Sequence, residues 1–138
     1  MNLRDIETFN PSICIARKIQ KSNRIINNIF RKHLKHLNLS NSQVSILFVL
    51  SKKKSITQKN LSDFLVLEKS TVNRNIKRLV SQGYLEIKNV NQICITNPGI
   101  KKVQNIIPYW EKAMVETEAI LQEEGLSSLN TVLVKLTT

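Results

Sequence analysis

Residues 55–84 decide the fold, and they read SITQKNLSDFLVLEKSTVNRNIKRLVSQGY. Within this stretch Val72, Ile76 and Leu79 are spaced by three and four residues, which is typical of the buried face of a helix. Gly83 ends that helix, as a glycine does just past a helix C-terminus. The first four residues of the stretch open a shorter helix, and a connection of about three or four residues joins the two. This arrangement predicts a helix-turn-helix.

The segments on either side complete a winged helix. Another helix, with Ser40 or Ser42 as its cap, precedes the stretch and ends in the basic run Lys52–Lys54. After Gly83 the apolar residues alternate over Tyr84–Lys88 and again over Gln92–Thr96, with three residues in between. Two such runs predict a short β-hairpin. Three helices and a hairpin form a winged helix-turn-helix.

Long apolar stripes flank this lobe. Helical spacing from Ile15 to Leu37 predicts one helix of about 25 residues that begins near Pro11. A second long helix follows the hairpin, with a kink expected at Pro108 and a break at Gly125. Each stripe needs a partner, so we expect these helices to pack against a second copy of the chain. The residues predicted at this dimer interface are Ile15, Ile19, Ile26, Trp110, Leu129 and Leu133.

Length and composition are those of a single folded domain. The chain has 138 residues, of which 41% are hydrophobic, with 3 Gly, 3 Pro and 2 Cys. The longest apolar run, Ile46–Leu50, is too short to span a membrane, and Met1–Asp5 lacks the apolar core of a secretory signal. We therefore expect a cytoplasmic domain over residues 1–138, mainly α (α+β). The lobe covers about 38–100, and the dimerisation helices cover about 11–37 and 98–138.

The positive charge is concentrated in the first two thirds of the chain. The net charge is +11, and residues 10–102 hold 18 basic side chains against three acidic ones. Residues 103–138 hold two basic and five acidic side chains. This asymmetry predicts that the first part meets a polyanion, with nucleic acid favoured. A membrane surface is not favoured, because no segment pairs a basic face with an exposed apolar one.

The order and spacing of several short motifs resemble the MarR family of bacterial transcriptional regulators. The motifs are Leu39-Ser40 ahead of Gln43, Ile56–Leu61, Leu67 with Lys69–Arg74, Leu79 with Gln82–Leu85, and Ile95–Gly99. The resemblance implies a homodimer that binds a pseudo-palindromic site in double-stranded DNA. It also implies that the helix from Lys69 enters the major groove and that the hairpin lies along the minor groove. A small-molecule effector is a candidate partner.

The predicted recognition helix presents a polar face. With Val72, Ile76 and Leu79 inward, Arg74 is placed to read guanine, and Asn73 to read adenine. Residues at the helix start can donate to phosphate, and so can lysines that flank the groove, although the lysine run can equally be a solvated surface. The predicted DNA contacts are Lys54, Lys59, Lys69, Ser70, Thr71, Asn73, Arg74, Asn75, Lys77, Arg78, Lys88 and Asn89.

Two features depart from the family pattern. The family's hairpin usually carries an acidic residue and an arginine a few positions apart, and residues 87–93 have neither. Lys88, Asn89 and Asn91 are the polar candidates for minor-groove contact in this shorter hairpin. Glu68 stands where an aspartate usually caps the recognition helix, although a carboxylate still suits the positive end of the helix dipole.

A few other side chains are candidate sites. His33 and His36 lie three residues apart on one helix and would need a third ligand to bind zinc, so we expect polar packing and no metal. Cys14 lies at a helix start, where the dipole favours a thiolate, which makes it a candidate for oxidant sensing. Tyr109 and Trp110 are expected in the core, or alternatively lining a ligand cleft between the dimer helices and the lobe.

The sequence predicts a regulator and no catalytic activity. It contains no paired carboxylates, no nucleophile beside a base and no glycine-rich phosphate loop, and no cofactor is expected. The predicted function is a sequence-specific, dimeric repressor whose DNA binding is relieved by a ligand or an oxidant. The alternative is a winged-helix protein with reduced base reading. Such a protein would act as a protein-binding antagonist or as a non-specific DNA binder.

Overall fold

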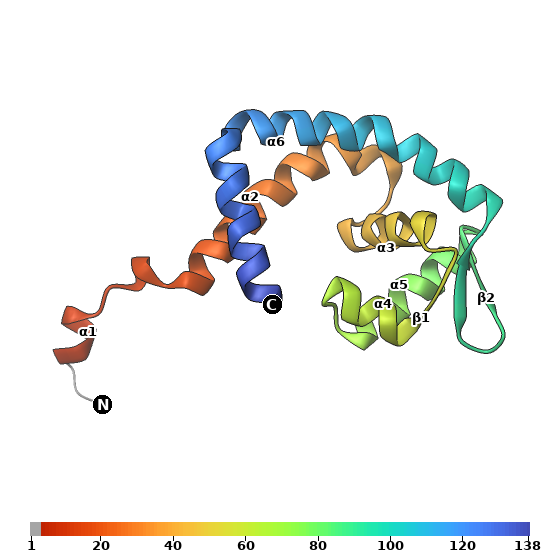
Figure 1. Ribbon diagram of the computed structural model, residues 1–138, viewed down its shortest axis with the longest axis horizontal. Coiled ribbons are helices and arrows are strands. Elements are labelled where there is room, and N and C mark those ends of the chain that lie inside the picture. Colours follow the sequence, from red (N-terminus) through yellow and green to blue (C-terminus); the bar gives the residue numbers. More distant parts are fainter. Residues whose placement is uncertain (1–3) are drawn as a thin grey trace.

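The computed structural model describes residues 4–138 as a compact lobe beside two long helices that project from it (Figure 1). The α-helices are α1 (Arg4–Thr8), α2 (Ile15–Leu34), α3 (Asn41–Lys52), α4 (Gln58–Leu65), α5 (Lys69–Ser81) and α6 (Asn97–Thr137). The strands are β1 (Ser55–Thr57), β2 (Leu85–Lys88) and β3 (Gln92–Ile95), and two short 3₁₀ helices, η1 (Pro11–Ile13) and η2 (Lys35–Leu37), flank α2. The mainly helical winged helix-turn-helix is confirmed.

Helices α3, α4 and α5 form the core of the lobe. Val72 and Leu79 of α5 are fully buried against Leu47 and Leu50 of α3 and Leu61 of α4. Helix α3 begins with a capping box, in which Ser40 and Gln43 each bond the other's backbone N–H group. This cap satisfies two N–H groups that would otherwise be unpaired at the helix start. The three-residue connection between α4 and α5 agrees with the predicted helix-turn-helix.

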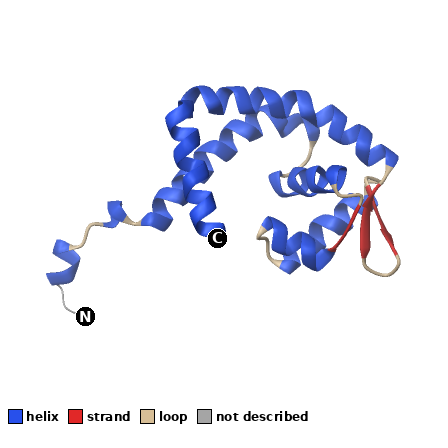
Figure 2. Cartoon of the chain, in the orientation of Figure 1, coloured by secondary structure: helices blue, strands red, loops and turns tan. Residues whose placement is uncertain are grey.

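A small antiparallel sheet closes the lobe, with strand order β1-β3-β2 (Figure 2). Strands β2 and β3 are the predicted hairpin, here called the wing. Strand β1 was not predicted, because residues 55–58 were expected to open a helix. Instead Ile56 is buried opposite Ile93 of β3, and Thr57 caps α4 by accepting a hydrogen bond from the Asn60 N–H group. A strand of three residues is too short to show alternation.

Helix α2 is shorter than predicted. Cys14 is extended, so the helix begins at Ile15, and it ends at Leu34 before η2. The short helix α1 was not predicted, and Asn10 caps η1 between them. Helix α2 lies along α6, as Figure 1 shows.

The break in helix α6 lies three residues before Gly125, where it was predicted. The backbone stays helical through Pro108 and Gly125, and its only non-helical residue is Gln122, with φ 58° and ψ −179°. Figure 1 shows α6 turning sharply and running back across α2. Proline removes one backbone bond but its fixed φ suits a helix, and packing of Ile106 and Trp110 on the core holds the helix on both sides of it. No described helix is long and apolar enough to cross a membrane.

Candidate nucleic-acid interface

The second helix of the helix-turn-helix turns a basic face to solvent. Val72, Ile76 and Leu79 anchor α5 in the core, so Arg74, Lys77 and Arg78 point outward. Thr71 and Asn73 are half-buried at the sides of the helix. The exposed predicted contacts are Lys69, Ser70, Arg74, Lys77 and Arg78.

The positive charge of this face is not neutralised by the protein. Within residues 4–138 the ion pairs are Lys32 and His33 with Glu116, and Lys88 with Glu86. None involves a cation of α5. Glu68 at the N-cap makes no side-chain capping bond, which leaves the N-terminal N–H groups of α5 open to an acceptor. Free cations next to a helix N-terminus suit phosphate.

Asn75 is not a DNA contact, contrary to the prediction. Only 8% of it is exposed, and the Gln43 side-chain amide donates a hydrogen bond of 3.3 Å to its Oδ1 atom. The reason is helical geometry, because Asn75 lies three residues after Val72 and four before Leu79 on the buried side. That spacing was visible in the sequence. Asn75 joins α5 to α3 instead of reading a base.

The basic residues around β1 are exposed. Lys54 and Lys59 are free of ion pairs within the described part of the chain. Lys53 lies over the Phe64 ring, with its Nζ atom 5.2 Å from the ring centroid. Phe64 lies three residues after the buried Leu61 on α4, but 60% of it is exposed. Its aromatic face binds a lysine, as cations do over aromatic rings.

The wing carries little free charge. Lys88 pairs with Glu86 at 3.4 Å, and these are the only charged residues of β2 and β3. Asn89 and Val90 form the tip, both with positive φ. The predicted contacts Lys88 and Asn89 are exposed.

A cavity of about 270 Å³ lies where the long helices meet the lobe. Its lining includes Phe30 of α2, Phe48 of α3 and Trp110 of α6. Trp110 packs edge-to-face on Phe48, with ring centroids 5.8 Å apart. Trp110 is therefore half-buried against the core of its own chain, and it also lines this cavity. Tyr109 does not line the cavity and packs against His36.

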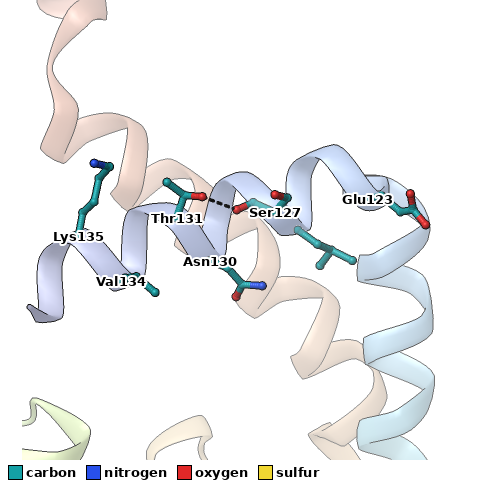
Figure 3. Close-up of a pocket in the computed structure, with 7 residues that line it drawn as sticks. Glu123, Ser127, Asn130, Thr131, Val134 and Lys135 are labelled. Atoms are coloured by element: carbon teal, nitrogen blue, oxygen red, sulfur yellow. Dashed lines mark hydrogen bonds between the residues drawn. The ribbon is translucent and has the colours of Figure 1, made fainter.

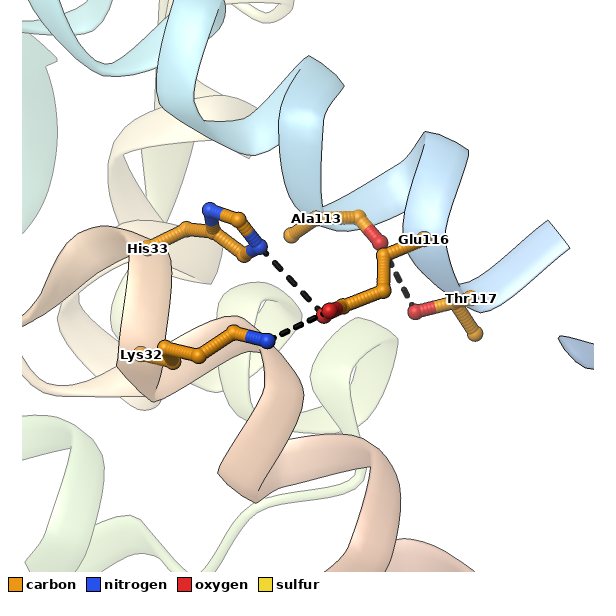
Figure 4. A network of polar contacts seen from close by, with 5 residues as sticks. All are labelled: Lys32, His33, Ala113, Glu116 and Thr117. Atoms are coloured by element: carbon orange, nitrogen blue, oxygen red, sulfur yellow. Dashed lines mark hydrogen bonds and ion pairs between the residues drawn. The ribbon is translucent and has the colours of Figure 1, made fainter. Parts of the chain in front are cut away.

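A polar cluster ties α2 to α6 (Figure 4). Lys32 and His33 both bind the Glu116 carboxylate, His33 through Nε2 at 3.3 Å. The hydrogen bond from Lys32 is the main reason that the pKa of Glu116 lies below its usual value. Burial acts against this shift, and the hydrogen bond to His33 adds to it. His36 packs on Tyr109. Both histidines thus make contacts inside the chain, and among residues 4–138 no group of three ligands could hold a metal.

Of the residues predicted for dimerisation, Trp110 packs on Phe48 beside the lobe, and the other five lie along α2 and the last part of α6. Ile15, Ile19, Leu129 and Leu133 are exposed, and Ile26 is half-buried. All but Ile15 line an apolar groove of about 420 Å³ between α2 and the last turns of α6. A second, more polar hollow on the end of α6 runs from Glu123 to Lys135, and Thr131 donates to the Ser127 carbonyl there (Figure 3).

The two cysteines are unpaired thiols. Cys14 is exposed at the N-cap of α2, the place at which the sequence put it, and Cys94 is half-buried on β3. They lie in different parts of the fold, so they do not form a disulfide with each other in this structure.

Comparisons with known proteins point to one family. The model of the MarR family matches residues 37–91, which span the lobe from the end of η2 to the wing tip. A curated relative from Bacillus subtilis (strain 168), the uncharacterized HTH-type transcriptional regulator YwoH, is 31% identical over 97 residues. The match covers 67% of this chain and 71% of that protein.

Solved structures share the fold at lower identity. BpsR of Bordetella bronchiseptica, whose DNA binding is regulated by 6-hydroxynicotinic acid, gives a TM-score of 0.83 at 17% identity. That match covers 93% of this chain and 97% of BpsR. A variant of MarR from E. coli, solved with operator DNA, gives a TM-score of 0.81 at 21% identity, covering 95% and 99%.

Proposed function

The chain belongs to the MarR family of transcriptional regulators, and from this we propose that it is a homodimeric, cytoplasmic repressor that binds a pseudo-palindromic site in double-stranded DNA. The observation that supports this function best is the solvent-facing side of α5, on which Arg74 and its basic neighbours have no acidic partner within residues 4–138. Proteins of this family act by binding DNA and are not enzymes.

The two parts of the chain have separate roles in this proposal. The lobe, about residues 38–100, places α5 in the major groove. The flanking helices, about 11–37 and 98–138, join two copies. Recognition helices of such a dimer meet half-sites about 34 Å apart, one turn of DNA, so a small rotation of either lobe weakens binding.

We further propose that a small molecule relieves DNA binding from the cavity beside Trp110. The cavity lies between the dimer helices and the lobe, where a ligand would change the angle between them. Its lining is largely apolar, as in most ligand sites, and its size suits a ligand of a few tens of atoms at most. Trp110 is the only tryptophan of the chain, so its fluorescence reports on this cavity. Titration with small aromatic acids should quench or shift it and release DNA. Oxidation of the exposed Cys14 is a second candidate signal.

The test of DNA binding is fluorescence anisotropy of the full chain. The probes are the DNA upstream of its own gene and a scrambled duplex, each at several salt concentrations. A specific regulator binds its own DNA well above the scrambled control at physiological salt. Equal, salt-sensitive binding to both duplexes would indicate a general DNA binder, and no binding to either would contradict the proposal.

Arg74→Ala tests the assigned recognition helix. We expect a loss of about 1–3 kcal/mol at one base position, with specificity relaxed there and the fold unchanged. Arg24→Ala is the charge-matched control, because Arg24 is exposed on α2 away from the lobe. Equal effects of the two substitutions would mean that Arg74 contributes only net charge.

A further inference from the structure

The tip of the wing holds a valine in an unfavourable backbone conformation. Asn89 and Val90 have φ values of 49° and 74°, and the Asn91 N–H group donates a 2.9 Å hydrogen bond to the Asn89 carbonyl. This is a three-residue turn with positive φ at its centre, a rare and strained form. A β-branched residue is a true outlier there, whereas glycine would fit without strain.

Packing within residues 4–138 does not account for this valine. Val90 is 98% exposed, and Ile87, on the strand that leads to it, is 52% exposed. The side chains on each side, Asn89 and Asn91, are exposed amides. Strained residues that the fold itself does not use are concentrated at binding sites. The tip therefore presents an apolar apex between two amides.

The wing also lacks the charge expected of a general phosphate contact. Its two charged residues, Glu86 and Lys88, pair with each other and have no net charge. Helix α5, in contrast, carries free cations. Figure 1 shows the tip projecting on the same side of the lobe as α4 and α5, away from α6. A neutral, apolar tip is thus placed beside a basic recognition helix.

We propose that Val90, between Asn89 and Asn91, reads the minor groove beside the site contacted by α5 and selects A·T over G·C pairs there by direct contact with the base edges rather than by charge. The inference rests on the proposed DNA-binding function and adds a specificity-determining residue to it. The floor of an A·T minor groove offers only acceptors, which amide N–H groups can meet. A G·C pair adds the guanine amino group, which an apolar side chain would bury without a partner.

The test needs a DNA site for the full-length protein, obtained by selection from a random duplex library. Base pairs flanking the selected core are then varied one at a time as A·T, G·C and inosine·C. Inosine·C removes the minor-groove amino group and leaves the major-groove edge of guanine. At one or two flanking positions we expect G·C to weaken binding about five- to tenfold, and inosine·C to restore it.

Val90→Gly assigns the preference to the tip. The substitution removes the side chain and relieves the backbone strain, so the wing stays folded. We expect this variant to bind the A·T, G·C and inosine·C sites equally well. Val66→Gly is the matched control. Val66 is the other exposed valine with positive φ, at the end of α4, and its replacement should leave the flank preference intact.

The outcomes separate this inference from the proposed function. A selected core with no flank preference in the unmodified protein overturns the inference and leaves specific DNA binding in place. A flank preference that survives Val90→Gly also overturns it, as does a preference that inosine·C fails to restore. If the library yields no preferred sequence at all, the proposed function fails and the inference fails with it.

Discussion

Arg74 and Asn75 are neighbours in the sequence with different roles. Arg74 points to solvent, whereas Asn75 is buried and bonded to Gln43. One step along a helix rotates a side chain by about 100°, which separates a base-reading position from a core position. Polar residue type alone does not distinguish the two.

Asn75→Ala should therefore lower stability rather than DNA specificity. The change leaves the buried Gln43 amide without its partner, which costs about 1–3 kcal/mol in the free energy of unfolding. Denaturant unfolding measures the loss. Asn73→Ala is the control, since the half-buried Asn73 side chain makes no hydrogen bond within residues 4–138, and its effect on stability should stay within about 0.5 kcal/mol. A weak effect of Asn75→Ala on unfolding, with relaxed base preference, would contradict this assignment.

At the scale of elements, the wing and α6 are joined closely at one point. Thr96 accepts a hydrogen bond from the Gly99 N–H group at 3.1 Å and donates one to the Gly83 carbonyl at 2.6 Å. A Cβ atom at Gly99 would overlap the Tyr84 carbonyl oxygen. Only a glycine allows the helix to start this close to the strand.

Gly99→Ala should cost about 2–3 kcal/mol in unfolding free energy, because backbone must move to accept the methyl group. Gly83→Ala offers a comparison without a clash. Gly83 has φ +84° and open space around it, so alanine there meets only backbone strain of about 1–2 kcal/mol. Chemical denaturation of both variants gives the difference. Equal losses of unfolding free energy in the two variants would show that the backbone at Tyr84 moves at little cost.

The contact between α2 and α6 should depend on pH through Glu116. Its pKa is lower in the folded protein because Lys32 bonds the carboxylate, so this stabilisation is present above the pKa of an unfolded glutamate, about 4.3, and is lost as the pH falls through the folded pKa. Glu116→Gln should lower the melting temperature at neutral pH, and the difference should shrink on acidification. Glu118→Gln, on an exposed residue without an ion pair, is the control. If the difference in melting temperature between the two proteins persists in acid, the Glu116 carboxylate is not its cause.

Most elements could be predicted from spacing, and the exceptions have physical reasons. Helix α5, its end at Gly83 and the wing follow from apolar periods of 3.6 and 2. Strand β1 is too short to have a period. The break in α6 falls at Gln122, whose residue type gives no such signal, while packing keeps Pro108 within the helix.

At the scale of the whole molecule, the apolar surface is the main feature left unexplained by one chain. The flanking helices expose Ile15, Ile19, Leu129, Leu133 and Leu136. A soluble protein rarely leaves so many large apolar side chains together in water. A second copy of the chain would cover them.

Leu133→Asp should convert the dimer to a monomer and abolish tight binding to a palindromic site. A buried, unpaired carboxylate at an interface is costly, and one lobe alone contacts one half-site. Sedimentation measures the mass, which we expect to be twice 15.8 kDa before the substitution. Leu133→Met keeps the volume and should keep the dimer. A Leu133→Asp protein that remains dimeric would place the interface elsewhere.

The candidate site was less predictable than the fold. Charge and position identified the exposed residues of α5, and they also included Asn75, whose hydrogen bond to Gln43 joins two helices far apart in sequence. The Val90 turn depends on backbone angles, which no residue pattern revealed, and the pairing of Lys88 with Glu86 depends on the strand register.

The direction of the last part of α6 depends on the backbone angles of one residue, Gln122. The 15 residues after Gln122 form a helical segment about 22 Å long. A rotation of this segment by about 10° at Gln122 would move its C-terminal end by about 4 Å. In a dimer joined through these segments, the φ and ψ angles of Gln122 would set the distance between the two recognition helices. The spacing of the half-sites that the dimer fits could then change without any substitution in α5 or in the cavity beside Trp110.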